Sequence, residues 1–160
     1  MAIDTIEDKE LEIIVATYLK DKKLTEYEDC LNAFFGGIVL KEGSEIIIQP
    51  QCCGDISDIT KWETIGEMNS RNWKQLWIGH PWVYVKKQNA DIEFTEYTED
   101  DKEMEELKIQ YKASQEIIVE EFQKARKILI DFQQRIYQIL KKKNIENALE
   151  IAKIITGTND

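Results

Sequence analysis

The part of this chain beyond Pro81 is constrained most by what it lacks, because neither glycine nor proline occurs again before Gly157. These two residues are the strongest local interruptions of a helix. Apolar residues in this stretch recur in steps of three, four and seven, which lines one face of an α-helix. The sequence therefore predicts one long helix over residues 102–142, or two helices that meet near residues 112–114, and a last short helix after Asn144. The residues that carry the pattern are Leu107, Tyr111, Ile118, Phe122, Ala125, Leu129, Phe132, Ile136 and Leu140.

The apolar stripe of the long helix is wider than the seam of a two-stranded coiled coil. Ile117, Val119, Ile128 and Ile130 extend it beyond the heptad positions. A coiled-coil dimer buries a narrow seam, whereas a helix packed within a domain buries a broader face. We therefore expect the helix to pack against its own chain, and the protein to be a monomer rather than a coiled-coil dimer.

Two helices are predicted at the N-terminus. Apolar residues spaced three or four apart mark residues 3–20 and residues 25–35. Thr5 stands where it can cap the first helix. Gly36 and Gly37 should end the second, because glycine readily adopts the left-handed conformation that terminates helices.

A small antiparallel sheet is predicted in the middle of the chain. Asp58 can cap a short helix over residues 59–65, whereas residues 72–78 fit a helical turn or a strand equally well. The fold class is therefore α+β: two N-terminal helices, a small antiparallel sheet, and a long C-terminal helix plus a short terminal helix. The length of 160 residues fits a single domain over residues 1–160. The strand-forming runs lie at residues 38–40, 45–48, 82–85 and 92–97.

Charge is distributed unevenly along the chain. Residues 1–100 contain 20 acidic and 10 basic residues, a net charge of −10, whereas residues 101–160 contain 11 of each, a net charge of zero. An acidic surface repels the phosphates of nucleic acids and attracts basic proteins. The chain therefore divides into an acidic α+β part and a charge-balanced helical part, and we expect a basic protein partner and no nucleic acid.

The N-terminus and the cysteines indicate the compartment. The opening sequence MAIDTIEDKE carries acidic charge and no apolar core, which is unlike a signal peptide. No apolar run approaches the roughly 18 residues that a membrane span needs. Three cysteines, an odd number, fit a reducing compartment better than a disulfide framework. We therefore expect a cytoplasmic protein without a membrane-spanning segment.

Uncommon residues are concentrated between Gln49 and Trp82. This stretch holds all four tryptophans, both prolines, the only histidine, His80, and two of the three cysteines, Cys52 and Cys53. Thiols and an imidazole are ligands that zinc prefers. However, adjacent cysteines in a strand point to opposite faces, and the chain has neither a CxxC motif nor a second histidine. The sequence therefore predicts no metal and no cofactor.

The same residue types allow a nucleophilic enzyme. Cys52 or Cys53 would supply the thiolate, His80 the base, and Asp55 or Asp58 would orient the imidazole. In the alternative, the histidine holds a turn and the cysteines pack beside the tryptophans. We expect the structural role, and keep the Cys/His-dependent enzyme as the alternative.

The four tryptophans could form an aromatic platform for a ligand or the core beneath the long helix. The core is favoured, because each aromatic side chain buries about 150–250 Å² and the sheet is small. A tryptophan left partly exposed would mark a binding face. We expect Trp62 to be such an apolar anchor, surrounded by the acidic contact residues Asp55, Asp58, Glu63 and Glu67.

The string QPQCCGDISDITKW…W…LWIGHPW resembles a box found in small uncharacterised bacterial proteins, to which no activity is attached. The similarity covers residues 36–98 and includes the strings GGIVL, from Gly36, and FTEYT, from Phe94. In general style the chain is similar to the immunity proteins that bacteria keep against secreted toxins, which are small, acidic, cytoplasmic α+β proteins without a catalytic signature. The resemblance implies a bacterial binding protein and transfers no catalytic residue.

Together, these features predict a non-enzymatic acidic binding protein of the bacterial cytoplasm. It would be an immunity-type inhibitor that occludes a basic partner protein through charge complementarity. Two alternatives come from other classes: an enzyme centred on Cys52, Cys53 and His80, and a structural or oligomeric protein built on the long helix.

Overall fold

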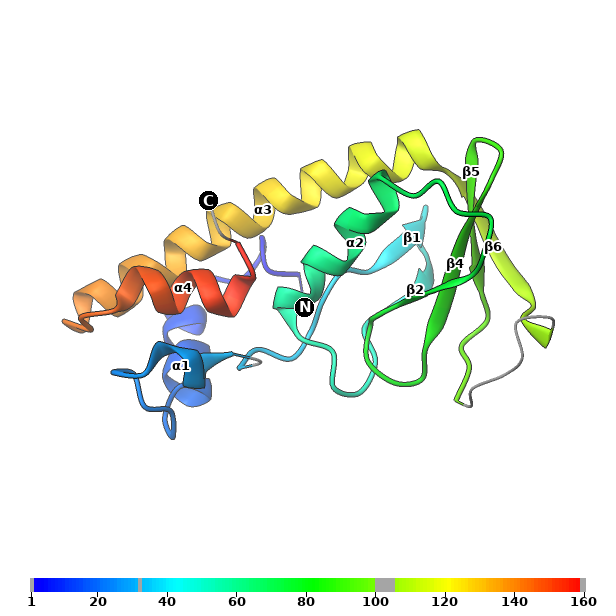
Figure 1. Ribbon diagram of the computed structural model, residues 1–160. Coiled ribbons are helices and arrows are strands. Elements are labelled where there is room, and N and C mark those ends of the chain that lie inside the picture. The colour runs from blue at the N-terminus through cyan, green and yellow to red at the C-terminus, as the bar shows by residue number, and fades with distance from the viewer. Residues whose placement is uncertain (1, 32, 100–105, 159–160) are drawn as a thin grey trace.

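The computed structural model describes residues 2–31, 33–99 and 106–158 of the chain, and its ribbon is drawn in Figure 1. The fold is α+β, with antiparallel sheets and a long C-terminal helix followed by a short one, as the sequence predicts. In chain order the elements are α1 (Asp8–Tyr18), the 3-10 helix η1 (Tyr27–Cys30), β1 (Leu40–Glu42), β2 (Glu45–Ile48), the 3-10 helix η2 (Ile56–Asp58), α2 (Ile59–Gly66), β3 (Lys74–Leu76), β4 (Val83–Gln88), β5 (Asp91–Thr95), β6 (Ile109–Ser114), α3 (Gln115–Lys142) and α4 (Ala148–Thr156).

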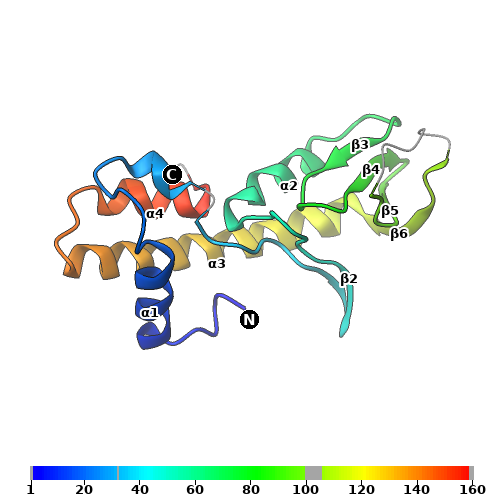
Figure 2. The ribbon, with the colours of Figure 1, turned by 90° about the horizontal axis from the view of Figure 1, so that it is seen from below.

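Helix α3 runs along the molecule and gives it an elongated shape (Figure 1). Helices α1 and α4 pack near its C-terminal end, and the larger sheet lies at its N-terminal end. Seen from below in Figure 2, α2 lies on one side of α3, and the β1–β2 hairpin projects from the other side. The N-terminal half of α3 is thus flanked by two separate elements of the acidic part of the chain.

The strands of the described residues form two antiparallel sheets rather than the single small sheet that the sequence predicts. One contains β1 and β2 alone, and the other has the order β3-β4-β5-β6. In the larger sheet, Val85 pairs with Phe94, and Phe94 pairs with Tyr111. Val85 and Phe94 are buried, which gives this sheet an apolar face towards the core. Residues 72–78, which fit a strand or a helical turn, contain strand β3.

The long helix begins at Gln115, so the prediction that it starts at residue 102 is wrong. Residues 109–114 form strand β6, which pairs with β5, and residues 102–105 lie outside the described residues. Tyr111 and Ala113 stand two apart, which fits the alternation of a strand, whereas residues on one face of a helix stand three or four apart. The expected junction near residues 112–114 is the point where strand gives way to helix.

The prediction of a second N-terminal helix over residues 25–35 is also wrong. Among the described residues of this range, only the 3-10 helix Tyr27–Cys30 forms. The backbone at Phe34 bonds elsewhere, because its N–H donates to the Asp55 carboxylate and its carbonyl accepts from the N–H of Ile56. The first helix starts at Asp8 rather than at residue 3, and Glu7 takes the capping position that was expected for Thr5.

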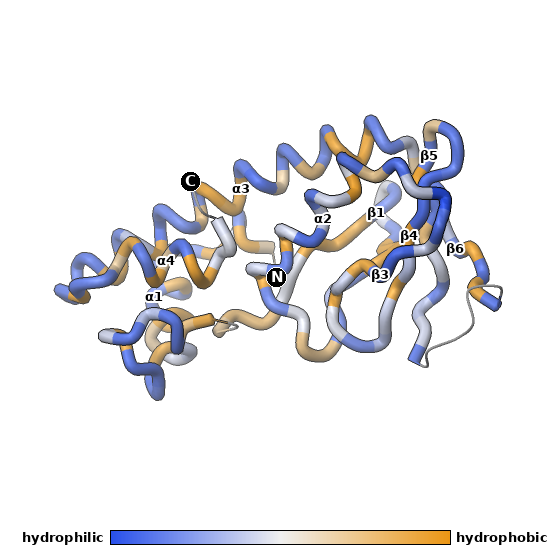
Figure 3. The backbone as a smooth tube through the Cα atoms, viewed as in Figure 1, coloured by the Kyte–Doolittle hydropathy of each residue, from blue (hydrophilic) through white to orange (hydrophobic). Residues whose placement is uncertain are grey.

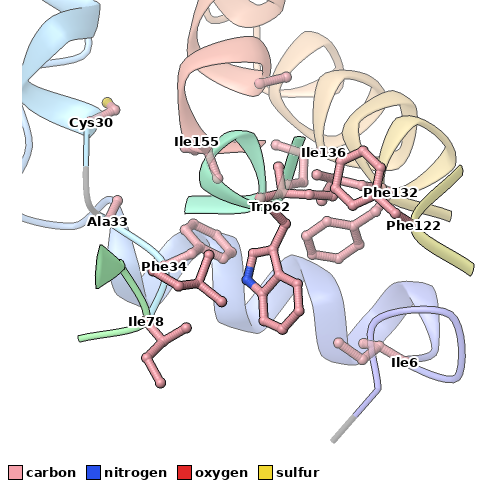
Figure 4. Close-up of a cluster of buried hydrophobic side chains, with 14 of the residues drawn as sticks. Ile6, Cys30, Ala33, Phe34, Trp62, Ile78, Phe122, Phe132, Ile136 and Ile155 are labelled. Atoms are coloured by element: carbon pink, nitrogen blue, oxygen red, sulfur yellow. The ribbon is translucent and has the colours of Figure 1, made fainter. Parts of the chain in front are cut away.

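A continuous apolar core joins the helices to the larger sheet. Figure 3 shows hydrophobic residues recurring along α3 and α4 and in the strands, and the buried ones among them form one cluster. The Trp62 indole lies close to Phe122 and Phe132 in Figure 4, with Phe34 nearby. Among the described residues, no helix is long and apolar enough to cross a membrane.

Candidate functional site

A groove of about 360 Å³ lies between α2 and α3, and we call it the α2/α3 groove. Its floor is apolar, because Trp62, Ile118 and Phe122 are all buried core residues. Glu63 and Glu67 stand exposed at its border. Three of the five predicted contact residues therefore meet at one place. The groove is lined by Trp62, Glu63, Ile65, Gly66, Glu67, Ile118, Val119, Phe122, Gln123 and Arg126.

Hydrogen bonds fix the 3-10 helix η2 that precedes α2 and the C-terminal end of α2. At the start of the preceding 3-10 helix, Asp55 accepts from the N–H of Ser57 at 2.9 Å and donates its own N–H to Asp58 at 2.8 Å. At the end of α2, the Gln115 side-chain amide donates to the carbonyl of Ile65 at 2.7 Å and lies 3.1 Å from that of Gly66. Since the last carbonyls of a helix have no partner within it, this amide satisfies groups that would otherwise remain open.

The charges at the α2/α3 groove are two carboxylates and one guanidinium. Glu63 Oε1 accepts from Arg126 Nη1 at 2.8 Å, and this ion pair connects α2 to α3. Glu67 caps the C-terminal end of α2 and is exposed. The border of the groove therefore carries a net negative charge above an apolar floor.

A second groove, of about 340 Å³, lies between the β1–β2 hairpin and α3. It shares Trp62, Ile118 and Phe122 with the α2/α3 groove, so this layer of side chains separates the two grooves. Ile117 and Ile128 line it and are exposed, by 60% and 37%. The expectation that these two isoleucines widen the buried stripe of α3 is wrong, because the hairpin stands away from the helix at this point.

Trp62 is buried rather than partly exposed, which corrects the expectation of a surface anchor. Only 4% of its surface is accessible, and its ring centroid lies 6.4 Å from that of Phe94. The tryptophan with the large exposed fraction is Trp77, at 38%. Trp62 can therefore contribute only as part of the floor of a groove.

Asp55 is also buried, with 2% of its surface accessible, so it cannot lie on an exposed acidic face. One carboxylate oxygen accepts from the N–H of Phe34 at 2.9 Å, and the other accepts from Ser57. The residue thereby connects the segment after η1 to the start of η2. Hydrogen bonds of this kind give Asp55 a structural role.

Asp58 is half-buried, and its carboxylate is occupied within the chain. Its Oδ2 accepts from the N–H of Asp55 at 2.8 Å and from Nε1 of Trp77 at 3.1 Å. Burial raises the pKa of the Asp58 carboxyl, and these two hydrogen bonds act in the opposite direction. Asp58 therefore holds Trp77 in place more than it offers charge to a partner.

The Cys52–His80 region is held together by backbone pairing. The His80 N–H donates to the Cys52 carbonyl at 2.9 Å, and the imidazole Nε2 lies 3.1 Å from the Glu99 carbonyl oxygen. The imidazole also meets the edge of Trp82, with ring centroids 5.0 Å apart. Within residues 2–31, 33–99 and 106–158, no hydrogen bond joins the imidazole to either thiol.

The two adjacent thiols contact each other rather than a base. Sγ of Cys52 lies 3.3 Å from Sγ of Cys53, and both residues are exposed. The hydrogen bond with Cys52 raises the pKa of the Cys53 thiol, which disfavours its thiolate. In the described part of the chain, no three histidine, cysteine, aspartate or glutamate side chains group closely enough to hold a metal ion.

The sequence could not indicate which residues of α3 contribute to the α2/α3 groove. Arg126 and Gln115 are separated by about fifty residues or more from the α2 groups that they contact, and these contacts depend on how the two helices pack. Glu63 and Glu67 could be predicted because they are acidic residues close in sequence to Trp62. Comparison of the chain with family models, curated proteins and solved structures finds no match.

Proposed function

We propose that this protein is a non-enzymatic binding protein that takes up a basic partner protein at the α2/α3 groove. The observation that carries the proposal is the pair of exposed carboxylates, Glu63 and Glu67, at the border of an apolar floor. Lysine and arginine side chains have an apolar stem and a charged head, and such a site suits both parts. The stem would lie over Trp62 and Phe122 while the head meets the carboxylates.

The Glu63–Arg126 ion pair bears on how such a partner would bind. Side chains of Glu63 and Arg126 are 43% and 33% exposed, so water weakens the pair. A partner arginine could share the Glu63 carboxylate, or Glu67 could receive it alone. The ion pair meanwhile keeps Glu63 at the border of the groove when no partner is bound.

The overall charge supports the same function. All of the net charge of −10 belongs to residues 1–100, which provide α2 and both of its acidic border residues. An acidic surface speeds the approach of a basic protein and turns it towards the complementary face. We propose an immunity-type mechanism in a bacterial cytoplasm, in which the bound protein blocks the partner's functional surface.

Affinity purification with matched charge variants tests this proposal. The double variant Glu63→Lys/Glu67→Lys changes the charge at the groove by four units. The variant Glu146→Lys/Glu150→Lys makes the same change at exposed positions before and within α4. Wild type and the α4 variant should recover the same basic protein from a lysate of the source organism, and the groove variant should lose it.

The binding proposal fails if the two variants recover the same proteins as wild type. It also fails if the groove variant and the α4 variant lose a protein equally, because the loss would then reflect net charge alone. Circular dichroism and a denaturation curve should show that each variant is folded before its binding is compared.

A further inference from the structure

The turn from Gln51 to Gly54, which we call the dithiol turn, presents two free thiols side by side at the surface. Cys52 and Cys53 are exposed and their sulfur atoms are 3.3 Å apart, whereas Cys30, the third cysteine, is buried. Thiols are reactive where they are accessible and close to a second sulfur. The pair differs from Cys30 in both respects.

Backbone hydrogen bonds fix the position of the dithiol turn. The Gly54 N–H donates to the Gln51 carbonyl at 3.0 Å and closes the turn, and the Gln51 N–H donates to the Ile78 carbonyl at 2.7 Å. On the opposite side Gly79 lies so close that a Cβ there would stand 2.3 Å from the Cys52 carbonyl oxygen. The two thiols are therefore carried by a rigid support.

Cys53 has a backbone conformation that cysteine does not favour. Its φ is 69°, in the left-handed region where glycine or asparagine fits more easily. A strained backbone at an exposed residue is a reason to ask what the side chain does. Here the strained residue brings its sulfur against that of its neighbour.

We propose that Cys52 and Cys53 form a modification site that closes to a disulfide by exchange with a low-molecular-weight disulfide. The Cys52 thiolate attacks one sulfur of that disulfide, forms a mixed disulfide and releases the first small thiolate. Cys53 then loses its proton to solvent and attacks the Cys52 sulfur, and the second small thiolate leaves. Two protein thiols are oxidised, and one small disulfide is reduced to two thiols.

The contact between the two thiols places either one to resolve a mixed disulfide formed on the other. Their sulfur atoms are 3.3 Å apart, and either thiol can donate the hydrogen bond between them. The raised pKa of Cys53 favours Cys52 as the first sulfur to attack.

The closed form should be easy to reduce again. Adjacent Cα atoms are about 3.8 Å apart across a trans peptide, which is less than the roughly 4.4 Å that disulfides usually span. A disulfide formed under this strain is labile and readily opened by a thiol. The site is thus suited to reversible modification rather than to stabilising the fold.

Incubation of the full chain with mixtures of reduced and oxidised glutathione tests the proposal. After acid quenching, the protein is unfolded, alkylated with N-ethylmaleimide and weighed by mass spectrometry. The reduced chain takes a label on each of its three cysteines. The closed chain should be two hydrogens lighter, take one label on Cys30 and return to three labels after reduced glutathione is added.

Three variants act as controls. Cys52→Ser and Cys53→Ser each lack the resolving pair, so they should accumulate a glutathione adduct at least about tenfold above wild type. Cys30→Ser should close as wild type does. The proposal is overturned if wild type keeps glutathione adducts as the single variants do, if its disulfides join two chains, or if it remains fully reduced in excess oxidised glutathione.

Discussion

The buried carboxylate of Asp55 accepts a hydrogen bond from the backbone N–H of Phe34 at 2.9 Å. This contact joins two segments that lie 21 positions apart in the chain. It replaces the helical hydrogen bond that the apolar pattern of residues 25–35 led us to expect. An acidic residue that looks like a surface contact in the sequence is therefore part of the framework.

Replacing Asp55 should destabilise the fold. Asp55→Ala leaves the buried N–H of Phe34 without a partner and removes the cap at Ser57, and we expect the free energy of unfolding to fall by about 2–3 kcal/mol. Glu67→Ala, at an exposed position, should change it by less than about 0.5 kcal/mol. Urea denaturation of the two variants measures the difference, and equal effects would remove the structural role given to Asp55.

Gly79 should be intolerant of any side chain. In Gly79→Ala the new Cβ would meet the Cys52 carbonyl oxygen at 2.3 Å, and φ is 93°. The expected loss is about 3 kcal/mol or more, because the backbone must move and the strained conformation remains. Gly43→Ala is the matched control. Its φ is 60° but no atom lies within 4 Å, so thermal denaturation should reveal a loss of only about 1–2 kcal/mol.

The packing of α3 against its own chain can be tested at Phe122. This residue is 9% exposed and separates the two grooves, so Phe122→Ala should lower the free energy of unfolding by about 3 kcal/mol. Ile117→Ala removes an exposed side chain on the same helix and should cost less than about 1 kcal/mol. A similar cost for both would mean that Ile117 is covered in solution, as it would be in a dimer formed through α3.

Glu93 should make stability depend on pH. It is buried in β5 between Lys112, at 2.6 Å, and Lys86, at 3.3 Å. The hydrogen bond from Lys112 is the main reason that the pKa of Glu93 is lowered, and Lys86 adds to it. Because the folded state holds this carboxylate ionised, its stabilisation is present above the ordinary glutamate pKa, about 4.3, and is lost as pH falls through the lowered value.

The variant Glu93→Gln isolates this effect. At pH 7 it should be about 1–3 kcal/mol less stable than wild type, since both lysines lose their charged partner. As the pH falls below about 4, that difference should shrink, because wild-type Glu93 becomes protonated as well. Urea denaturation at pH 7 and at acid pH measures this difference in the free energy of unfolding. A difference that stays constant or grows at acid pH would contradict the role given to Glu93.

The sequence predicted α3 well wherever the helical period alone decides the structure. Ile118, Phe122, Leu129, Phe132, Ile136 and Leu140 are all buried as the pattern indicates. Leu107 and Tyr111 continue the same spacing but lie before the helix, and Tyr111 belongs to β6 because β5 offers an edge to pair with. Pairing with a distant strand is not visible in local periodicity.

The candidate site was predictable only on the side that α2 supplies. Trp62, Glu63 and Glu67 are close in sequence and fall on one helix and its end, so their grouping follows from local structure. Arg126 enters from α3, 63 positions further on, and its pairing with Glu63 depends on how the two helices pack. Asp55 was misjudged because an acidic residue that caps a turn reads like any surface acid, and the hydrogen bond from Trp77 to Asp58 comes from a residue 19 positions further on.

The most direct test of the proposed function is the association rate of the protein with the basic partner that the purification recovers. At low salt, Glu63→Lys/Glu67→Lys should lower the association rate constant about tenfold or more, while the dissociation rate constant changes less. The difference should shrink as salt screens the charges. The control Glu146→Lys/Glu150→Lys should stay within about threefold of wild type. Equal association rate constants for both variants would contradict the proposal that the acidic border of the α2/α3 groove selects the partner. A loss of affinity that comes only from faster dissociation and does not depend on salt would contradict it as well.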